Sequence, residues 1–138
     1  MSVELPNGYK PSYDEPFMNP KQLEYFKRKL LAWKEDILKE SKETLQHLQE
    51  DSRKEPDIAD RASSETDWSV ELRTRDRQRK LIAKIDSALE RIREGEYGFC
   101  EVTGEHISLE RLDARPIATM TLEAQEMHER QEKVYRDE

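Results

Sequence analysis

Two aspartates with potential electrostatic roles lie in a segment that should form a bend. Asp57 and Asp60 follow Pro56, which has no backbone N–H and therefore disfavours continuation of a preceding helix. Each aspartate can cap the start of the next helix, or it can face outward and present negative charge to a partner. The residues alone favour the capping role, although a capping carboxylate can still face outward.

A cluster of cationic residues follows this bend in the segment RTRDRQRK, residues 73–80. Arg73 and Arg77 are four residues apart, so they share one face of a helix. They can form a solvated surface that pairs with Glu71 or Asp76, or a contact surface for another molecule.

Residue patterns typical of catalysis are missing from the sequence, which has no glycine-rich phosphate loop and no Ser/His/Asp set. We therefore expect no enzymatic activity. The single cysteine, Cys100, excludes an intrachain disulfide. It is expected to be either a small core residue or an exposed thiol that is sensitive to oxidation.

Two long helices are expected to position the bend. Asn19 and Pro20 suit the start of the first helix, which an apolar repeat extends to about Glu50. The second helix should begin between Asp60 and Asp67 and end near Glu94, before Gly95. Two such helices joined by a short bend should pack antiparallel. The apolar stripes include Leu38, Leu45 and Leu48 in the first helix and Trp68, Leu72 and Leu81 in the second, with a polar interruption at residues 73–80.

The predicted fold is mainly α: a long antiparallel coiled-coil hairpin with a small knob and a C-terminal helix. We divide the chain into a flexible tail at 1–18, the hairpin at 19–94 with its tip at about 51–67, and the knob with the terminal helix at 95–138. Short β-like pieces are expected at residues 97–99 and 106–109, and the terminal helix is expected to pack beside the knob.

The charge balance limits the partners. The chain carries a formal net charge of −7, and 40% of its residues are charged. An acidic total argues against DNA or an anionic membrane as the main partner. No apolar segment is long enough to cross a membrane, and no secretory signal is recognisable, so we expect a cytoplasmic protein. We also expect a monomer, because the polar interruption disfavours extended self-pairing.

Two segments carry a family resemblance. The runs EPDIADRASSETDWSVELRTRDRQRKLIAKI and EYGFCEVTGEHISLERLDARP resemble the DksA/TraR family of bacterial RNA polymerase regulators, with the motifs in order at the family's spacing. The resemblance implies that the coiled-coil rod enters the secondary channel of RNA polymerase and changes the lifetime of the open promoter complex. It also implies cooperation with guanosine tetraphosphate in the stringent response, without direct sequence-specific DNA binding.

The resemblance also assigns roles to individual residues. Asp57, Asp60 and Ala62 match the tip that acts near the polymerase active site. Arg73 and Arg77 match positions that hold the rim of the channel. The alarmone site would be formed with polymerase by Leu81, Lys84 and Arg115. The family's usual lysine after its last cysteine is Gln125 here, which removes one positive charge from that site.

The knob departs from the four-cysteine zinc pattern of typical members. The four ligand positions are occupied by Cys100, Thr103, Thr121 and Ala124. Because hydroxyls are poor zinc ligands, we expect a degenerate zinc-finger-like knob with no metal and no other cofactor.

Two other functions remain open from the residues. An acidic rod tip could position a catalytic metal inside polymerase, as a transcript-cleavage factor does. The rod could also be a passive coiled-coil adaptor, although the polar interruption disfavours extended self-pairing.

Overall fold

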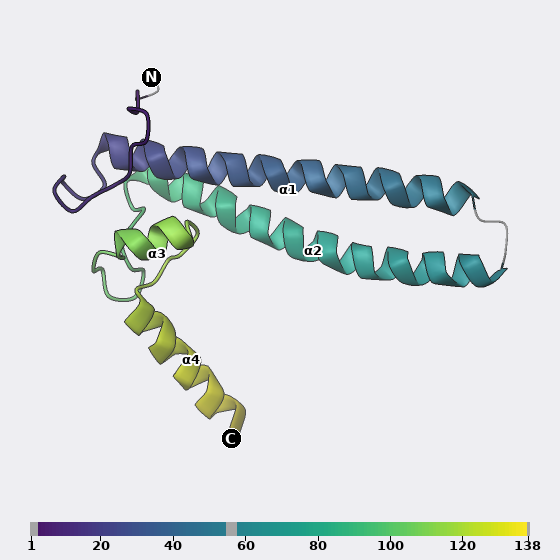
Figure 1. The fold of residues 1–138 in the computed structure, drawn as a ribbon. Coiled ribbons are helices and arrows are strands. Elements are labelled where there is room, and N and C mark those ends of the chain that lie inside the picture. The colour runs from purple at the N-terminus through teal and green to yellow at the C-terminus, as the bar shows by residue number, and fades with distance from the viewer. Residues whose placement is uncertain (1–2, 55–57, 138) are drawn as a thin grey trace. The chain divides into compact units, whose positions relative to one another are not determined.

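The computed structural model describes residues 3–54 and 58–137 and is mainly helical, as the sequence predicts. Its helices are α1 (Pro20–Lys54), α2 (Ile58–Glu94), α3 (Leu109–Ala114) and α4 (Leu122–Asp137). Figure 1 shows these four helices, and the chain divides into two compact units. The hairpin unit comprises Leu31–Asp86, and the base unit comprises the residues up to Leu30 together with those from Ser87 onward.

The start of α1 agrees with its predicted cap. The Asn19 side-chain oxygen accepts hydrogen bonds from the backbone N–H groups of Lys21 at 2.9 Å and Gln22 at 3.0 Å. These bonds satisfy donors that have no partner within the helix. The predicted boundaries at the bend are too conservative, because α1 continues to Lys54 and α2 already begins at Ile58.

The hairpin unit is an antiparallel helix pair with a thin apolar interface. The Lys34 ammonium pairs with the Asp86 carboxylate at 2.7 Å, which joins α1 to α2. Ile37 and Ile85 are its buried apolar side chains among the described residues. Leu38 and Leu72 do not continue the apolar stripe as predicted, because 50% and 53% of their surfaces are exposed.

A polar layer replaces apolar packing in the middle of this hairpin. The Arg75 guanidinium of α2 donates a hydrogen bond to the Ser41 hydroxyl of α1 at 3.3 Å. The nearby Gln78 side-chain oxygen is buried without a hydrogen-bond partner. An unsatisfied buried oxygen is unfavourable, so this layer should contribute little to the stability of the hairpin.

The base unit holds most of the core. Phe26 and Leu30 of α1 are fully buried, and Phe26 contacts the Tyr97 ring with 5.5 Å between the ring centroids. Ile107 and Leu112 complete the centre of this core. The predicted β-like pieces reduce to one isolated antiparallel bridge between Phe99 and His106, and Leu109 begins α3 instead of ending a strand.

The segment before α1 packs against the knob within the base unit, which differs from the flexible tail indicated by its prolines and glycine. The Tyr13 hydroxyl accepts the backbone N–H of Leu109 at 3.0 Å and donates to the Glu110 carboxylate at 2.6 Å. The Phe17 ring stacks on His106 with 3.9 Å between centroids. These contacts connect residues nearly one hundred positions apart, which no local sequence pattern encodes.

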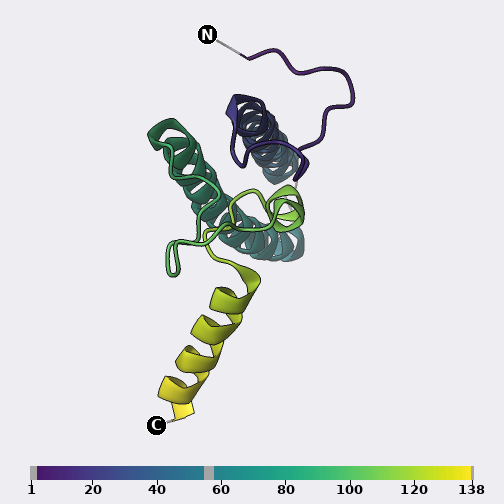
Figure 2. The same cartoon turned by 90° about the vertical axis from the view of Figure 1, so that its left-hand side faces the viewer.

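Helix α4 packs against the rest of the base unit only at its start, contrary to the prediction that it lies beside the knob. Ala124 is buried, whereas Met127, Val134 and Tyr135 are more than half exposed. In both views α4 extends away from α3 without another described helix of its unit beside it (Figure 1, Figure 2). Within the described residues, no helix combines the length and apolar character that a membrane crossing needs.

Candidate functional site

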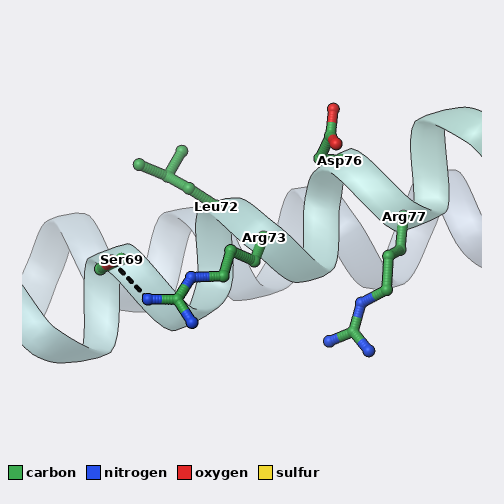
Figure 3. Close-up of a pocket in the computed structure, with 5 residues that line it drawn as sticks. All are labelled: Ser69, Leu72, Arg73, Asp76 and Arg77. Atoms are coloured by element: carbon green, nitrogen blue, oxygen red, sulfur yellow. Dashed lines mark hydrogen bonds between the residues drawn. The ribbon is translucent and has the colours of Figure 1, made fainter.

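A shallow hollow on α2 contains the two arginines identified from the sequence. It is lined by Ser69, Leu72, Arg73, Asp76 and Arg77. We call these five residues the α2 patch (Figure 3). Leu72 and Asp76 lie along one edge, and the Arg73 and Arg77 guanidiniums lie along the other (Figure 3).

The two guanidiniums of the α2 patch make only weak contacts within the chain. Arg73 lies 3.5 Å from the Ser69 hydroxyl, and Arg77 lies 3.5 Å from the Thr74 hydroxyl. Neither has a carboxylate partner among the described residues, whereas Asp76 pairs with Lys80 at 3.4 Å. The alternative that Arg73 and Arg77 pair with Glu71 or Asp76 therefore has no support in this geometry.

The predicted tip lies at the junction of α1 and α2. Asp57 is outside the described residues. Asp60 and Ala62 belong to the first turns of α2, with side chains outside the described set. A negatively charged residue at this end of a helix interacts favourably with the helix dipole. The tip function of these residues stays a prediction.

The three predicted alarmone residues come from both units. Leu81 and Lys84 lie on α2 in the hairpin unit, where Lys84 is exposed. Arg115 caps the end of α3 in the base unit and is also exposed. Neither cation has an ion-pair partner among the described residues. Gln125 donates from its side-chain amide to Glu129 at 3.0 Å and supplies no positive charge.

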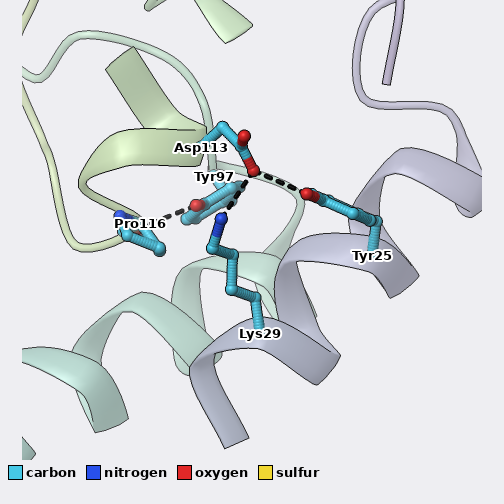
Figure 4. Close-up of polar contacts among 5 residues, drawn as sticks. All are labelled: Tyr25, Lys29, Tyr97, Asp113 and Pro116. Atoms are coloured by element: carbon cyan, nitrogen blue, oxygen red, sulfur yellow. Dashed lines mark hydrogen bonds and ion pairs between the residues drawn. The ribbon is translucent and has the colours of Figure 1, made fainter. Parts of the chain in front are cut away.

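A polar cluster holds α1 to α3 in the base unit. Asp113 Oδ1 accepts hydrogen bonds from the Lys29 ammonium and from the Tyr25 hydroxyl, each at 2.6 Å (Figure 4). The hydrogen bond from Lys29, followed by that from Tyr25, lowers the pKa of Asp113. Burial, together with the bond to Asp113, raises the pKa of Tyr25 to about 12.

The buried Tyr97 forms a second link in the same region. Its hydroxyl donates to the Pro116 carbonyl at 2.8 Å (Figure 4). Burial raises the pKa of Tyr97, so the hydroxyl remains protonated and able to donate. The segment LDARP, residues 112–116, is thus held to α1 at Asp113 and to Tyr97, which follows α2, at Pro116.

Cys100 is a buried free thiol at the knob, in agreement with the core alternative for this residue. Burial alone would raise the pKa of the thiol. Hydrogen bonding from Thr103, and from the backbone at Thr121 and Val102, outweighs burial and lowers the pKa to about 7. The Thr121 hydroxyl accepts the N–H of Ala124 at 3.2 Å at the start of α4. The four ligand-like positions therefore lie in one region, with a single thiol among them.

Leu72 and Asp113 are residues whose placement the sequence analysis missed. The end of the apolar stripe directly after Leu72 was a usable signal that this leucine is more than half exposed. For Asp113 there was no such signal, because its partners Tyr25 and Lys29 are more than eighty residues away.

Two family models match most of the chain. Residues 22–92 match the model described as DnaK suppressor protein DksA, N-terminal domain. Residues 95–130 match the model described as prokaryotic dksA/traR C4-type zinc finger.

Curated relatives and a solved structure agree with these matches. The chain is 68% identical to the RNA polymerase-binding transcription factor DksA of Caulobacter vibrioides, over 96% of this chain and 93% of the relative. It is 39% identical to the protein of that name from Escherichia coli K12, over 96% and 90% of the two chains. The structure of transcription factor DksA2 from Pseudomonas aeruginosa superposes with a TM-score of 0.78 at 38% identity, covering 85% of this chain and 90% of the other.

The match at residues 95–130 corrects the expectation of a degenerate zinc-finger-like knob with no metal. This segment fits a C4-type zinc-finger model, which points to zinc. Of the four thiolates that such a finger needs, the structure supplies one, and the described residues hold no group of three or more His, Cys, Asp or Glu that could bind a metal. The donors present therefore do not fit a four-thiolate site.

Proposed function

The chain belongs to the DksA family, and we propose that it regulates bacterial transcription by inserting its α1–α2 hairpin into the secondary channel of RNA polymerase. This role brings the bend between Lys54 and Ile58 near the polymerase active site, where Asp57 and Asp60 act by their negative charge. Ala62 allows close approach there. The protein changes the stability of the open promoter complex and performs no catalysis of its own.

The α2 patch is the observation that carries this proposal. Arg73 and Arg77 are exposed cations without a carboxylate partner among the described residues, in a chain whose net charge is −7. Unpaired cations on an otherwise acidic chain can bind an acidic surface of another protein. The pair lies on the hairpin itself, where docking at the rim of the channel would hold the rod.

The slim form of the hairpin unit also supports insertion. A two-helix rod is roughly 20 Å across, so it can enter a channel that excludes a globular domain. We propose that the chain is a cytoplasmic monomer and that RNA polymerase is its main partner. Guanosine tetraphosphate would bind at the shared interface, near Leu81, Lys84 and Arg115.

The test combines equilibrium binding to RNA polymerase with run-off transcription from a ribosomal RNA promoter. Asp60→Asn should bind as the native chain does but lose most of the inhibition, because the carboxylate acts at the tip. Asp67→Asn, an exposed aspartate further along α2, should retain inhibition. Replacing Arg73 and Arg77 together with alanine should weaken binding by about tenfold or more, whereas Lys39→Ala on α1 should not. Unchanged inhibition by Asp60→Asn would contradict the tip mechanism.

The same assay with guanosine tetraphosphate separates the alarmone site from docking. Lys84→Ala should keep its basal inhibition and lose the additional response to the alarmone. The transcript-cleavage alternative predicts short 3′ fragments released from backtracked complexes, and we expect none.

A further inference from the structure

We infer that Asp113 is a positioning residue for Arg115, the base-unit cation that is proposed to bind the phosphates of the alarmone. This inference rests on the proposed function, because it takes Arg115 as a phosphate contact. It goes beyond that function by assigning a role to a carboxylate that would itself repel a phosphate. Asp113 acts through its bonds to Lys29 and Tyr25 of α1, which fix the segment that carries Arg115.

Arg115 follows α3 in a segment that is fixed at several backbone atoms. Its N–H donates to the Arg111 carbonyl at 2.7 Å, and its own carbonyl accepts the N–H of Ala118 at 2.9 Å. The carbonyl of the next residue, Pro116, accepts the hydroxyl of the buried Tyr97 at 2.8 Å (Figure 4). The backbone of Arg115 is therefore ordered, while its side chain is exposed and has no ion-pair partner in the part of the chain that the structure describes.

Asp113 holds the same segment to α1. It lies two residues before Arg115, and its Oδ1 accepts the Lys29 ammonium and the Tyr25 hydroxyl, each at 2.6 Å (Figure 4). The Tyr25 ring in turn makes an edge-on contact with the fully buried Phe26, with 5.2 Å between the ring centroids. The segment is thus anchored to the core both before and after Arg115.

The two donors also keep Asp113 from competing for Arg115. A carboxylate two residues from an arginine can form an ion pair with it and so occupy the guanidinium that a phosphate needs. Here Lys29 and Tyr25 both bind Oδ1 of Asp113. The hydrogen bond from Lys29, followed by that from Tyr25, lowers the pKa of Asp113, so these bonds persist at neutral pH. The Arg115 guanidinium is left available for a polyphosphate.

Positioning and local charge predict opposite effects of removing the Asp113 charge. Loss of a negative charge near a polyanion site would by itself strengthen binding of the anion. Loss of positioning should weaken it, because a less ordered arginine gives up more conformational freedom on binding. That cost corresponds to a rise of about three- to tenfold in the dissociation constant. The sign of the change therefore separates the two effects.

The experiment measures binding of labelled guanosine tetraphosphate to RNA polymerase carrying the full-length chain, relative to polymerase alone. Asp113→Asn should raise the dissociation constant by about three- to tenfold. Tyr25→Phe, a milder variant that keeps the ring and removes one donor, should raise it by about two- to fivefold. Asp113→Glu keeps the charge and should recover most of the affinity. Binding of each variant to polymerase without the alarmone should match that of the native chain.

Two further variants separate positioning from a general loss of stability. Gly104→Ala, at a knob glycine with a φ of +77° and open space around it, lowers stability through the backbone. It should keep the native affinity for the alarmone. Arg115→Ala removes the group that Asp113 positions, so Asp113→Asn should add less than about twofold in that background.

Native or tighter alarmone binding by Asp113→Asn would overturn the inference, as would an equal loss in Gly104→Ala. Additive losses from Asp113→Asn and Arg115→Ala would overturn it too, because the carboxylate would then act independently of the arginine. If Arg115→Ala binds the alarmone as the native chain does, the alarmone role proposed for Arg115 fails and the inference fails with it. A loss in Arg115→Ala without a loss in Asp113→Asn rejects the inference alone.

Discussion

Asp113 joins two distant parts of the base unit through a single carboxylate oxygen. Lys29 and Tyr25 both donate to Oδ1 at 2.6 Å, so loss of the negative charge weakens both contacts. The side chains of Lys29 and Asp113 are 38% and 43% exposed, so solvent screens part of their attraction. The cluster should therefore stabilise the fold modestly.

Asp113→Asn should lower the free energy of unfolding by about 0.5–1 kcal/mol near neutral pH. The folded-state pKa of Asp113 is lowered, so its contribution is present above the ordinary pKa of aspartate and is lost as the pH falls through the lowered value. Chemical denaturation across a pH series checks this. The exposed Asp36 on α1 provides the control, since Asp36→Asn should have little effect at any pH. A deficit in Asp113→Asn that is constant down to strongly acidic pH would contradict the assigned cause.

At the scale of single residues, the sequence predicted which charged residues share a helix face better than it predicted contacts between distant residues. It identified Arg73 and Arg77 as residues on one face, because helical periodicity determines which neighbours share a face. It could not predict the pairing of Tyr25 with Asp113 or the stacking of Phe17 on His106, because these depend on tertiary packing between distant segments. For Cys100, a family resemblance combined with missing ligands led to the expectation of no zinc, and the match to a zinc-finger model overturns that expectation.

At the scale of the elements, the hairpin has little apolar packing away from its base. Buried Ile37 and Ile85 lie toward one end of the hairpin unit, and a polar layer with Arg75, Ser41 and Gln78 follows. The sequence predicted this weakness from the missing apolar residues between Leu72 and Leu81. It assigned Leu38 and Leu72 to the seam incorrectly, because periodicity alone does not show where the two stripes stop facing each other.

Gln78→Leu should stabilise the hairpin by about 1 kcal/mol, because it removes a buried oxygen without a partner and extends the apolar interface. Amide hydrogen exchange in residues 31–86 measures the change. Arg79→Leu adds the same side chain at the exposed neighbouring position and should give no comparable protection. Equal protection in both variants would mean that the gain comes from general hydrophobicity and not from the polar layer.

The knob depends on a glycine that contacts the segment before α1. Gly98 has a φ of +92°, and a β-carbon there would lie 3.0 Å from Cγ and Cε of Met18. Gly98→Ala should therefore lower the free energy of unfolding through both the backbone conformation, at about 1 kcal/mol, and the contact with Met18. Gly104 has a φ of +77° and open space around it, so Gly104→Ala carries only the backbone cost.

Chemical denaturation of both glycine variants, and of Gly98→Ala combined with Met18→Ala, separates these two costs. The double variant should recover part of the loss if the Met18 contact is responsible. Identical losses in Gly98→Ala and Gly104→Ala would argue against that contact.

At the scale of the whole molecule, charge and fold suit a protein that acts inside a larger assembly. The chain is acidic overall, yet it leaves Arg73, Arg77, Lys84 and Arg115 exposed without ion-pair partners in the described part of the chain. The sequence predicted the mainly helical fold and the antiparallel hairpin because long periodic segments and a proline at the bend are strong local signals. It did not predict that the segment before α1 packs on the knob or that α4 is largely exposed, since these depend on packing that no local pattern records.

Site-specific photo-crosslinking tests the central claim most directly. A photoreactive amino acid replaces Glu65, an exposed residue of α2 near the bend, in the full-length chain bound to RNA polymerase. The same group at the exposed Glu123 of α4 is the control. We expect Glu65 crosslinks to polymerase segments that line the active site, and Glu123 crosslinks elsewhere. Crosslinks from Glu65 confined to the outer surface of polymerase would contradict insertion of the hairpin into the secondary channel.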